Sequence, residues 1–204
     1  QTDIGPVATA LLTRRIGLFS TGDVPAVISN ALSRLATQVG AAGGAIILPT
    51  TASLLQDDLF WSAVSSVPQA GPTLGYGQVC AENGLHIMDT ATVDWAETLV
   101  GLGATGVDIV IAYVAQQPLS GHPLIPLVQI SSTPGPAALH GADEEVSLNV
   151  DVDLLLHDTD NEDEIVSRLG DVLRAVLAGE EETVAVRNGD LAFQLSRGSL
   201  GISL

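Results

Sequence analysis

The chain has 204 residues, of which 46% are hydrophobic, so it is long enough for one α/β domain with a substantial core. It carries 24 acidic and 7 basic residues, and its formal net charge is −17. This charge argues against nucleic acids and anionic membranes as partners, because both need a positive protein surface.

The acidic residues are unevenly distributed, and all seven bases are arginine. Two explanations stay open: an acidic surface in a salt-adapted host, which the absence of lysine also fits, or a cation site. No apolar run reaches the roughly 18–20 residues that cross a bilayer, and no signal peptide is recognised. A single cysteine, Cys80, excludes an internal disulfide framework and an all-cysteine metal site. These points favour the cytoplasm.

Strands and helices alternate along the first part of the chain. Strands are predicted at residues 15–19, 45–48, 85–88 and 109–114, and helices at residues 24–39, 51–64 and around Trp95. Asp23 is expected to cap the first helix, and Thr90 or Thr92 to begin the third. Continuous apolar strands of this kind are typical of a parallel sheet that is buried on both faces.

The second part continues the pattern less regularly. A strand over residues 124–130 contains Pro126, which indicates an edge strand or a bulge. A strand at residues 152–156 precedes a helix with a capping pair, Thr159 and Glu162, and residues 182–204 have β character. We therefore expect a single α/β domain over residues 1–204, a three-layer α/β/α fold with a mainly parallel, Rossmann-like sheet.

A formal G-x-G-x-x-G match is formed by Gly101, Gly103 and Gly106. A dinucleotide loop needs its glycines after a strand and before a helix, so that backbone N–H groups face the pyrophosphate. Here the order is reversed, and the glycines are expected to end a helix and to permit close packing. Nucleotide binding is the alternative interpretation, and no nucleotide cofactor is expected.

The loop after residue 114 is the first candidate site. It follows the carboxyl end of a predicted strand, where open α/β sheets usually bind ligands, and it contains Gln116, Gln117, Ser120 and His122. His122 is a candidate general base or metal ligand, and the alternative is a loop histidine bonded to the backbone.

Two further candidates contain aspartate. Asp151 and Asp153 would point to the same side of a strand, and such a pair favours a hard cation or a raised pKa. Gly22 and Asp23 lie at a strand-to-helix turn, which is an ordinary position for binding a substrate or an anion. For Asp23 the alternative is the helix cap.

Two other pairs have simpler explanations. His86 and Asp89 lie at the end of a predicted strand, where Asp89 is favoured as a cap of the next helix. Asp94 and Glu97 would share a helix face, and a solvated first turn is favoured over a cation site there.

Several segments follow one another in an order that extends over nearly all of the chain: IGLFSTGD (16–23), AAGGAIILPTTASLL (41–55), YGQ (76–78), GLHIMDT (84–90), GLGATGVDIVIAYV (101–114), NVDVD (149–153), and a helix ending in Ala178-Gly179-Glu180. Together they resemble the C-terminal region of the altronate/galactarate dehydratase family, also called altronate hydrolases.

The resemblance implies that a sugar acid such as altronate or galactarate is dehydrated to a 2-keto-3-deoxy acid. A base would remove the proton alpha to the carboxylate, the β-hydroxyl would leave, and a divalent metal such as Fe²⁺, Mn²⁺ or Mg²⁺ would stabilise the enediolate. Of the family's site positions, only Asp23, Asp151 and Asp153 carry over. With the candidates above, catalysis is assigned to His122 and Asp23, metal binding to Asp151 and Asp153, and substrate binding to Gly22, Gln116, Gln117 and Ser120.

The chain also departs from the family pattern. Residues 20–23 lack the cysteine of the family's Cys-Gly-Gly-Ser-Asp-like stretch, residues 115–118 replace a Thr-Gly-Arg-Gly loop, and a segment with lysine and cysteine is deleted. The loss of these basic groups removes the obvious partners for a substrate carboxylate. Two hypotheses stay open: a metal-assisted lyase, and a non-catalytic ligand-binding protein or subunit. The second hypothesis predicts a homo-oligomer or a partner chain that carries the family's N-terminal domains.

Overall fold

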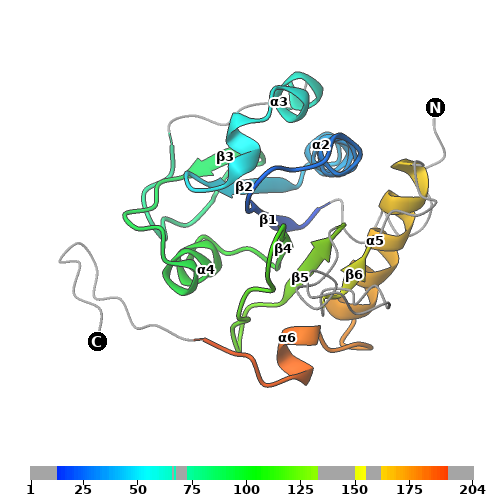
Figure 1. Cartoon of the computed structure of the whole chain (residues 1–204). Helices are drawn as coiled ribbons and strands as arrows, with labels where there is room; N and C mark the ends of the chain where they lie inside the picture. Colours follow the sequence, from blue (N-terminus) through cyan, green and yellow to red (C-terminus); the bar gives the residue numbers. More distant parts are fainter. Residues whose placement is uncertain (1–12, 66, 68–72, 133–149, 155–161, 193–204) are drawn as a thin grey trace.

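The computed structural model describes residues 13–65, 67, 73–132, 150–154 and 162–192. These residues form one six-stranded sheet in which every neighbouring pair of strands is parallel, in the order β3-β2-β1-β4-β5-β6 (Figure 1). The strands are β1 (Arg15–Ser20), β2 (Ala45–Pro49), β3 (Gly84–Met88), β4 (Ile109–Tyr113), β5 (Leu127–Ser131) and β6 (Val152–Asp153). The predicted three-layer, Rossmann-like α/β fold is confirmed.

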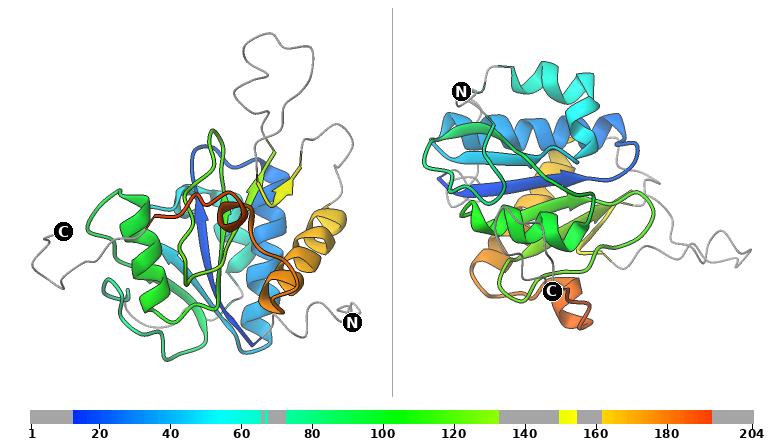
Figure 2. Two further views of the ribbon diagram at one scale, coloured as in Figure 1. Left: turned by 90° about the horizontal axis from the view of Figure 1, so that it is seen from below. Right: turned by 90° about the vertical axis from the view of Figure 1, so that its left-hand side faces the viewer.

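Helices cover both faces of the sheet. Figure 2 shows α2 and α3 on one face and α4 and α6 on the other, and α5 packs against α2 and β6. The helices are α2 (Ala26–Ala41), the 3-10 turn η1 (Ser53–Gln56), α3 (Asp58–Val64), α4 (Trp95–Ala104), α5 (Glu162–Leu177) and α6 (Val184–Arg187). None of the helices in this described part is long and apolar enough to span a bilayer.

The apolar runs of the sequence form the strands because both faces of the sheet are covered. All residues of β2, β4 and β5 are buried, and Ile46, Ile47 and Leu48 are fully inaccessible. Burial of each such side chain contributes roughly 1.5–3 kcal/mol to folding. The carboxyl ends of the strands therefore meet at one edge, held on a rigid core.

The caps predicted for the helices α2 and α4 are wrong. The N-cap of α2 is Pro25, without a side-chain hydrogen bond, and Asp23 is exposed. Asp23 lies three residues before the first helical residue, too far along the chain to act as the N-cap. The start of α4 is capped by Asp94, which accepts a 2.9 Å hydrogen bond from the Glu97 amide, so neither Thr90, Thr92 nor Asp89 caps it.

Three other elements differ from expectation. The helix expected over residues 51–64 is divided at Asp57 into η1 and α3. Pro126 precedes β5, which lies between β4 and β6 and is not an edge strand. Residues 184–187 form α6 instead of a strand. The predictions for residues 155–156, Thr159 and residues 193–204 lie outside the described residues.

Candidate functional site

A polar pocket of about 430 Å³ lies at the carboxyl ends of β1 and β2. The turn after β1 contributes Gly22 and Asp23, and the first residue of α2, Ala26, lines the same pocket. The remaining lining residues come from the turn before α2, from η1 and from the start of α3: Val24, Ser53, Gln56, Asp57, Asp58 and Leu59. We call this the carboxyl-edge pocket, because ligands of open parallel sheets bind at this edge.

A buried serine fixes η1 against β1. The Ser20 side chain is 1% exposed, and its Oγ accepts a 2.8 Å hydrogen bond from the Leu54 amide. The Ser53 hydroxyl donates to the same oxygen at 2.9 Å. These two bonds hold one wall of the carboxyl-edge pocket in place, so the pocket is preformed.

Both negative groups and the positive end of a helix surround this pocket. Asp23, Asp57 and Asp58 line it, and no arginine is among the lining residues. Asp57 is the N-cap of α3, since its Oδ1 accepts from the Leu59 amide at 2.9 Å. The start of α2, however, has no side-chain cap, so its first N–H groups and the positive end of the helix dipole lie at the pocket. The pocket thus combines carboxylates, which can accept hydrogen bonds from hydroxyl groups, with the positive end of a helix dipole.

The turns that follow β1 and β4, where the strand order reverses, are hydrogen-bonded to each other. The Thr21 amide donates to the Tyr113 carbonyl at 3.0 Å, and the Ala115 amide donates to Thr21 Oγ1 at 3.2 Å. Gly22 has a φ of +63° and packs directly on Ala115. The turns after β1 and β4 are thereby joined, and the open space lies beside β1 on the α2 and α3 face.

The loop from residue 114 to residue 126 is held by contacts with several elements. The Gln129 side chain accepts from the Leu119 amide at 2.6 Å and donates to the Leu119 carbonyl at 2.9 Å. Trp95 Nε1 donates to the Ser120 carbonyl at 2.7 Å. The Gly121 amide donates to the Asp190 carbonyl at 2.9 Å. The loop carries no regular strand or helix, but its course is fixed.

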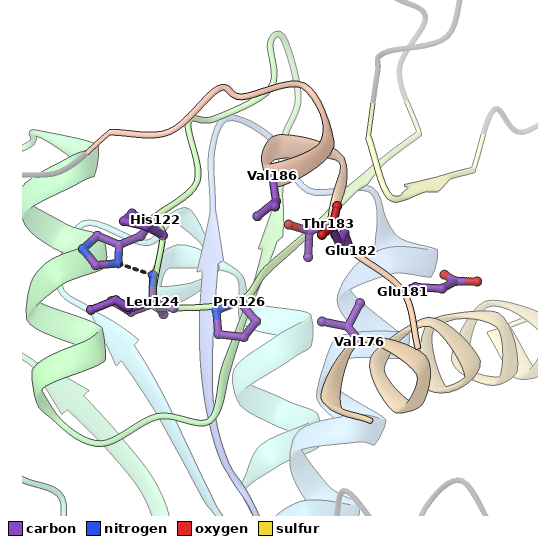
Figure 3. Close-up of a pocket in the computed structure, with 10 residues that line it drawn as sticks. His122, Leu124, Pro126, Val176, Glu181, Glu182, Thr183 and Val186 are labelled. Atoms are coloured by element: carbon purple, nitrogen blue, oxygen red, sulfur yellow. Dashed lines mark hydrogen bonds between the residues drawn. The ribbon is translucent and has the colours of Figure 1, made fainter. Parts of the chain in front are cut away.

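His122 lies in this loop and is 7% exposed. Its Nδ1 accepts a 3.1 Å hydrogen bond from the Leu124 amide, which places the proton of the neutral ring on Nε2 (Figure 3). Burial lowers the pKa of the His122 imidazole below its usual value. His122 lines a second pocket, of about 190 Å³, between this loop, the end of α5 and α6.

Asp151 links β5 to the start of α6 through its side chain. Its Oδ2 accepts from the Gln129 amide on β5 at 2.8 Å, and its Oδ1 accepts from the Val184 amide at the start of α6 at 2.7 Å. Burial raises the pKa of the Asp151 carboxyl, although these two hydrogen bonds act in the opposite direction. Asp153 follows on β6 opposite Ser131. Neither aspartate lines either of the two pockets described here.

The structure therefore separates the candidates into several places. Gly22 and Asp23 line the carboxyl-edge pocket, whereas His122 lines the second pocket. Gln116 and Gln117 are exposed just after β4, and Ser120 contributes its carbonyl to Trp95. Within the described ranges, no group of three or more His, Cys, Asp or Glu side chains is arranged to hold a metal ion.

Sequence reasoning missed the residues that η1 and α3 contribute to the carboxyl-edge pocket. Ser53, Gln56 and Asp57 follow the buried strand β2, as site residues commonly do. The signal was the break at Asp57, an aspartate directly before a helical segment. The prediction of one continuous helix over residues 51–64 did not take this signal into account.

The three glycines of the G-x-G-x-x-G match pack as expected. Gly101 and Gly103 are inside α4, where Tyr76 and Ile125 occupy the space that a Cβ would need. Gly106, with a φ of +91°, follows the helix and precedes β4. The three glycines permit close packing around the end of α4, and they do not form a strand-to-helix loop.

Comparisons with known proteins add no family assignment. No family model matches the chain, and a search of curated proteins found no significant match. The resemblance to the altronate/galactarate dehydratases therefore stays a prediction.

Proposed function

We propose that this chain binds a sugar acid in the carboxyl-edge pocket and serves as a ligand-binding or partner subunit of the altronate/galactarate dehydratase type. The observation that carries this proposal is that one pocket contains both the uncapped start of α2 and the carboxylates of Asp23, Asp57 and Asp58. A sugar acid offers a carboxylate to the first and hydroxyl groups to the second.

The positions of the candidate catalytic groups favour a binding function over an active enzyme. Asp23 and His122 line different pockets, and both oxygens of Asp151 already accept backbone hydrogen bonds. Acid–base chemistry needs its groups within hydrogen-bond reach of the same substrate atoms. In this proposal a separate chain with the family's N-terminal domains supplies the missing groups, and the complex works in the cytoplasm. A homo-oligomer is the other expected assembly.

A sugar-acid dehydratase is the second candidate function. Asp23 is exposed in the turn after β1 and lines a pocket that also offers Ser53 and Gln56 for substrate hydroxyls. Asp23 would remove the proton alpha to the substrate carboxylate, and the β-hydroxyl would leave with a proton as water. A divalent cation, Fe²⁺, Mn²⁺ or Mg²⁺, would supply charge stabilisation of the enediolate. Asp151 and Asp153, the ligands expected from the sequence, line neither pocket, so they do not fit a cation that acts in the carboxyl-edge pocket.

The binding proposal is tested with galactarate and with the uncharged polyol galactitol in isothermal titration calorimetry. The informative variant is Ala26→Pro, because proline is well tolerated at the first helical position and removes one N–H donor. Pro25 already has φ −58° and ψ 145°, a conformation that a following proline accepts. Loss of that donor should weaken galactarate binding about three- to tenfold, as expected for a charge-assisted hydrogen bond, and leave galactitol binding unchanged.

Two results would decide against this proposal. One is no heat with galactarate at any metal concentration, and the other is equal weakening of both ligands by Ala26→Pro. Titrations with and without Mg²⁺ and Mn²⁺ distinguish direct binding from binding that needs a cation. Formation of a 2-keto-3-deoxy acid by the isolated chain would favour the dehydratase instead.

A further inference from the structure

The second pocket is an apolar groove on the surface. Its walls are formed by Leu124 and Ile125 from the loop before β5, by Val176 at the end of α5, and by Val186 of α6 (Figure 3). Its volume of about 190 Å³ is below the roughly 300–1,000 Å³ of small-molecule sites. This space suits one large apolar side chain better than a whole ligand. We call it the Leu124 groove.

Apolar side chains are presented to solvent around this groove. Leu124 is 83% exposed and Val186 is 37% exposed, although both line the groove. The Leu124 backbone is fixed by its hydrogen bond to His122 Nδ1, and the preceding loop is fixed by Gln129. The groove is therefore preformed, which reduces the entropy that a partner must lose on binding.

The charge beside the groove is negative. Glu181 and Glu182 line it, and neither forms an ion pair within the described residues. Arg174, on the last turn of α5, pairs with Glu180 at 2.8 Å and not with either of them. Two exposed carboxylates beside an apolar depression complement a segment that carries a basic residue next to an apolar one.

We infer that the Leu124 groove docks a segment of a partner protein in which one leucine or phenylalanine enters the groove and an adjacent lysine or arginine pairs with Glu181 and Glu182. A net charge of −17 opposes close association of two copies of this chain, so a partner with basic residues is the better complement. This inference names a surface for the proposed partner chain, and so it rests on that part of the proposed function.

The test uses synthetic peptides on the full chain labelled with ¹⁵N. A peptide of sequence Gly-Ser-Arg-Leu-Arg-Ser-Gly, with blocked ends, should shift the amide signals of Leu124, Ile125 and Val186, and its affinity should fall when salt is raised. Two matched peptides serve as controls, one with alanine for leucine and one with glutamate for both arginines. Each should bind at least about fivefold more weakly, as expected when an anchor or its charge complement is removed.

Variants of the protein separate the groove from other surfaces. Leu124→Ser should weaken the arginine-leucine peptide about tenfold, and Glu181→Gln with Glu182→Gln should remove most of its salt dependence. Val93→Ser is the matched control, because Val93 is 92% exposed and is not among the groove residues. Leu124→Ser should leave galactarate binding in the carboxyl-edge pocket unchanged, so failure of either proposal is recognised separately.

Three outcomes would overturn the inference. The first is absence of peptide-induced shifts around the groove at millimolar peptide. The second is equal binding of the alanine peptide, which would mean that only charge is recognised. The third is a dimer in sedimentation velocity that Leu124→Ser abolishes, since the occupant would then be a second copy of the chain.

Discussion

Gly22 and Ala115 lie so close together that a Cβ on Gly22 would be 3.0 Å from the Cβ of Ala115. The contact joins the turns after β1 and β4, at the place where many Rossmann-like sheets open to bind a ligand. The backbone of Gly22 is also left-handed, with a φ of +63°. The proposed sugar-acid site is therefore the neighbouring carboxyl-edge pocket and not this place.

Gly22→Ala should destabilise the protein by about 1–3 kcal/mol, because it adds left-handed strain to a steric conflict. Gly189→Ala is the control: Gly189 has a φ of +68° but nothing within 4 Å of its added Cβ, so only the strain applies. Urea denaturation measures both. The double variant Gly22→Ala with Ala115→Gly should recover part of the loss, and strict additivity of the two changes would contradict the contact.

Asp151→Asn should destabilise the protein by about 2 kcal/mol at neutral pH. The amide retains one acceptor oxygen and directs N–H groups at one of the two backbone donors, those of Gln129 and Val184. Asp171→Asn, on the exposed face of α5, should change stability by less than about 0.5 kcal/mol. If the unfolding midpoints of the two variants coincide, Asp151 does not hold these elements together.

The effect of Asp151 on stability should depend on pH in an unusual direction. Burial raises the folded-state pKa of this carboxyl, so the folded protein binds the proton more readily than the unfolded chain. The contribution is complete below the unfolded pKa of about 3.9 and is lost as pH rises through the raised folded value. The stability difference between wild type and Asp151→Asn should therefore be smaller at pH 7 than at about pH 3.5, below the unfolded pKa. A difference that grows with pH would mean a lowered pKa.

His122 should give the opposite pH dependence. Burial lowers its folded-state pKa, so its contribution is complete above the unfolded value of about 6.5 and is lost as pH falls. Asparagine at this position can accept the Leu124 amide in an Asx-turn, but it does not titrate. Wild type should therefore lose more stability than His122→Asn between pH 8 and pH 5.5. His122→Phe, which has neither the acceptor nor a titrating group, should cost about 1 kcal/mol at pH 8 and less at pH 5.5.

The fold was predictable because its strands are buried on both faces. Such strands appear in the sequence as continuous apolar runs, so their positions and the parallel sheet were recognised. The start of α6 was not recognised, because its Val184 amide is satisfied by Asp151, 33 residues earlier in the chain. A helix that depends on a distant side chain leaves little signal in its own residues.

The composition of the candidate site was only partly predictable, for a related reason. Gly22 and Asp23 were identified because they follow a buried strand, and they line the carboxyl-edge pocket. The sequence grouped Asp23 with His122, but the two residues line different pockets. Only the tertiary structure shows this, since loops of similar composition leave the sheet toward different surfaces. Asp151 illustrates the limit most clearly: it directly precedes β6, and the two distant amides from which its carboxylate accepts, those of Gln129 and Val184, leave no trace in the residues around it.

The pairing of β1 with β4 at the centre of the sheet has a consequence for how the chain folds. Thr21 and Ala115, which meet just beyond this pair, are 94 residues apart in sequence. All of β2 and β3 lies between them, whereas β5 and β6 follow. Closing so large a loop costs entropy before its contacts form, and a high average separation of contacts slows folding. The β1–β2–β3 half can assemble from nearer segments, so the joining of the two halves is the step expected to limit the folding rate.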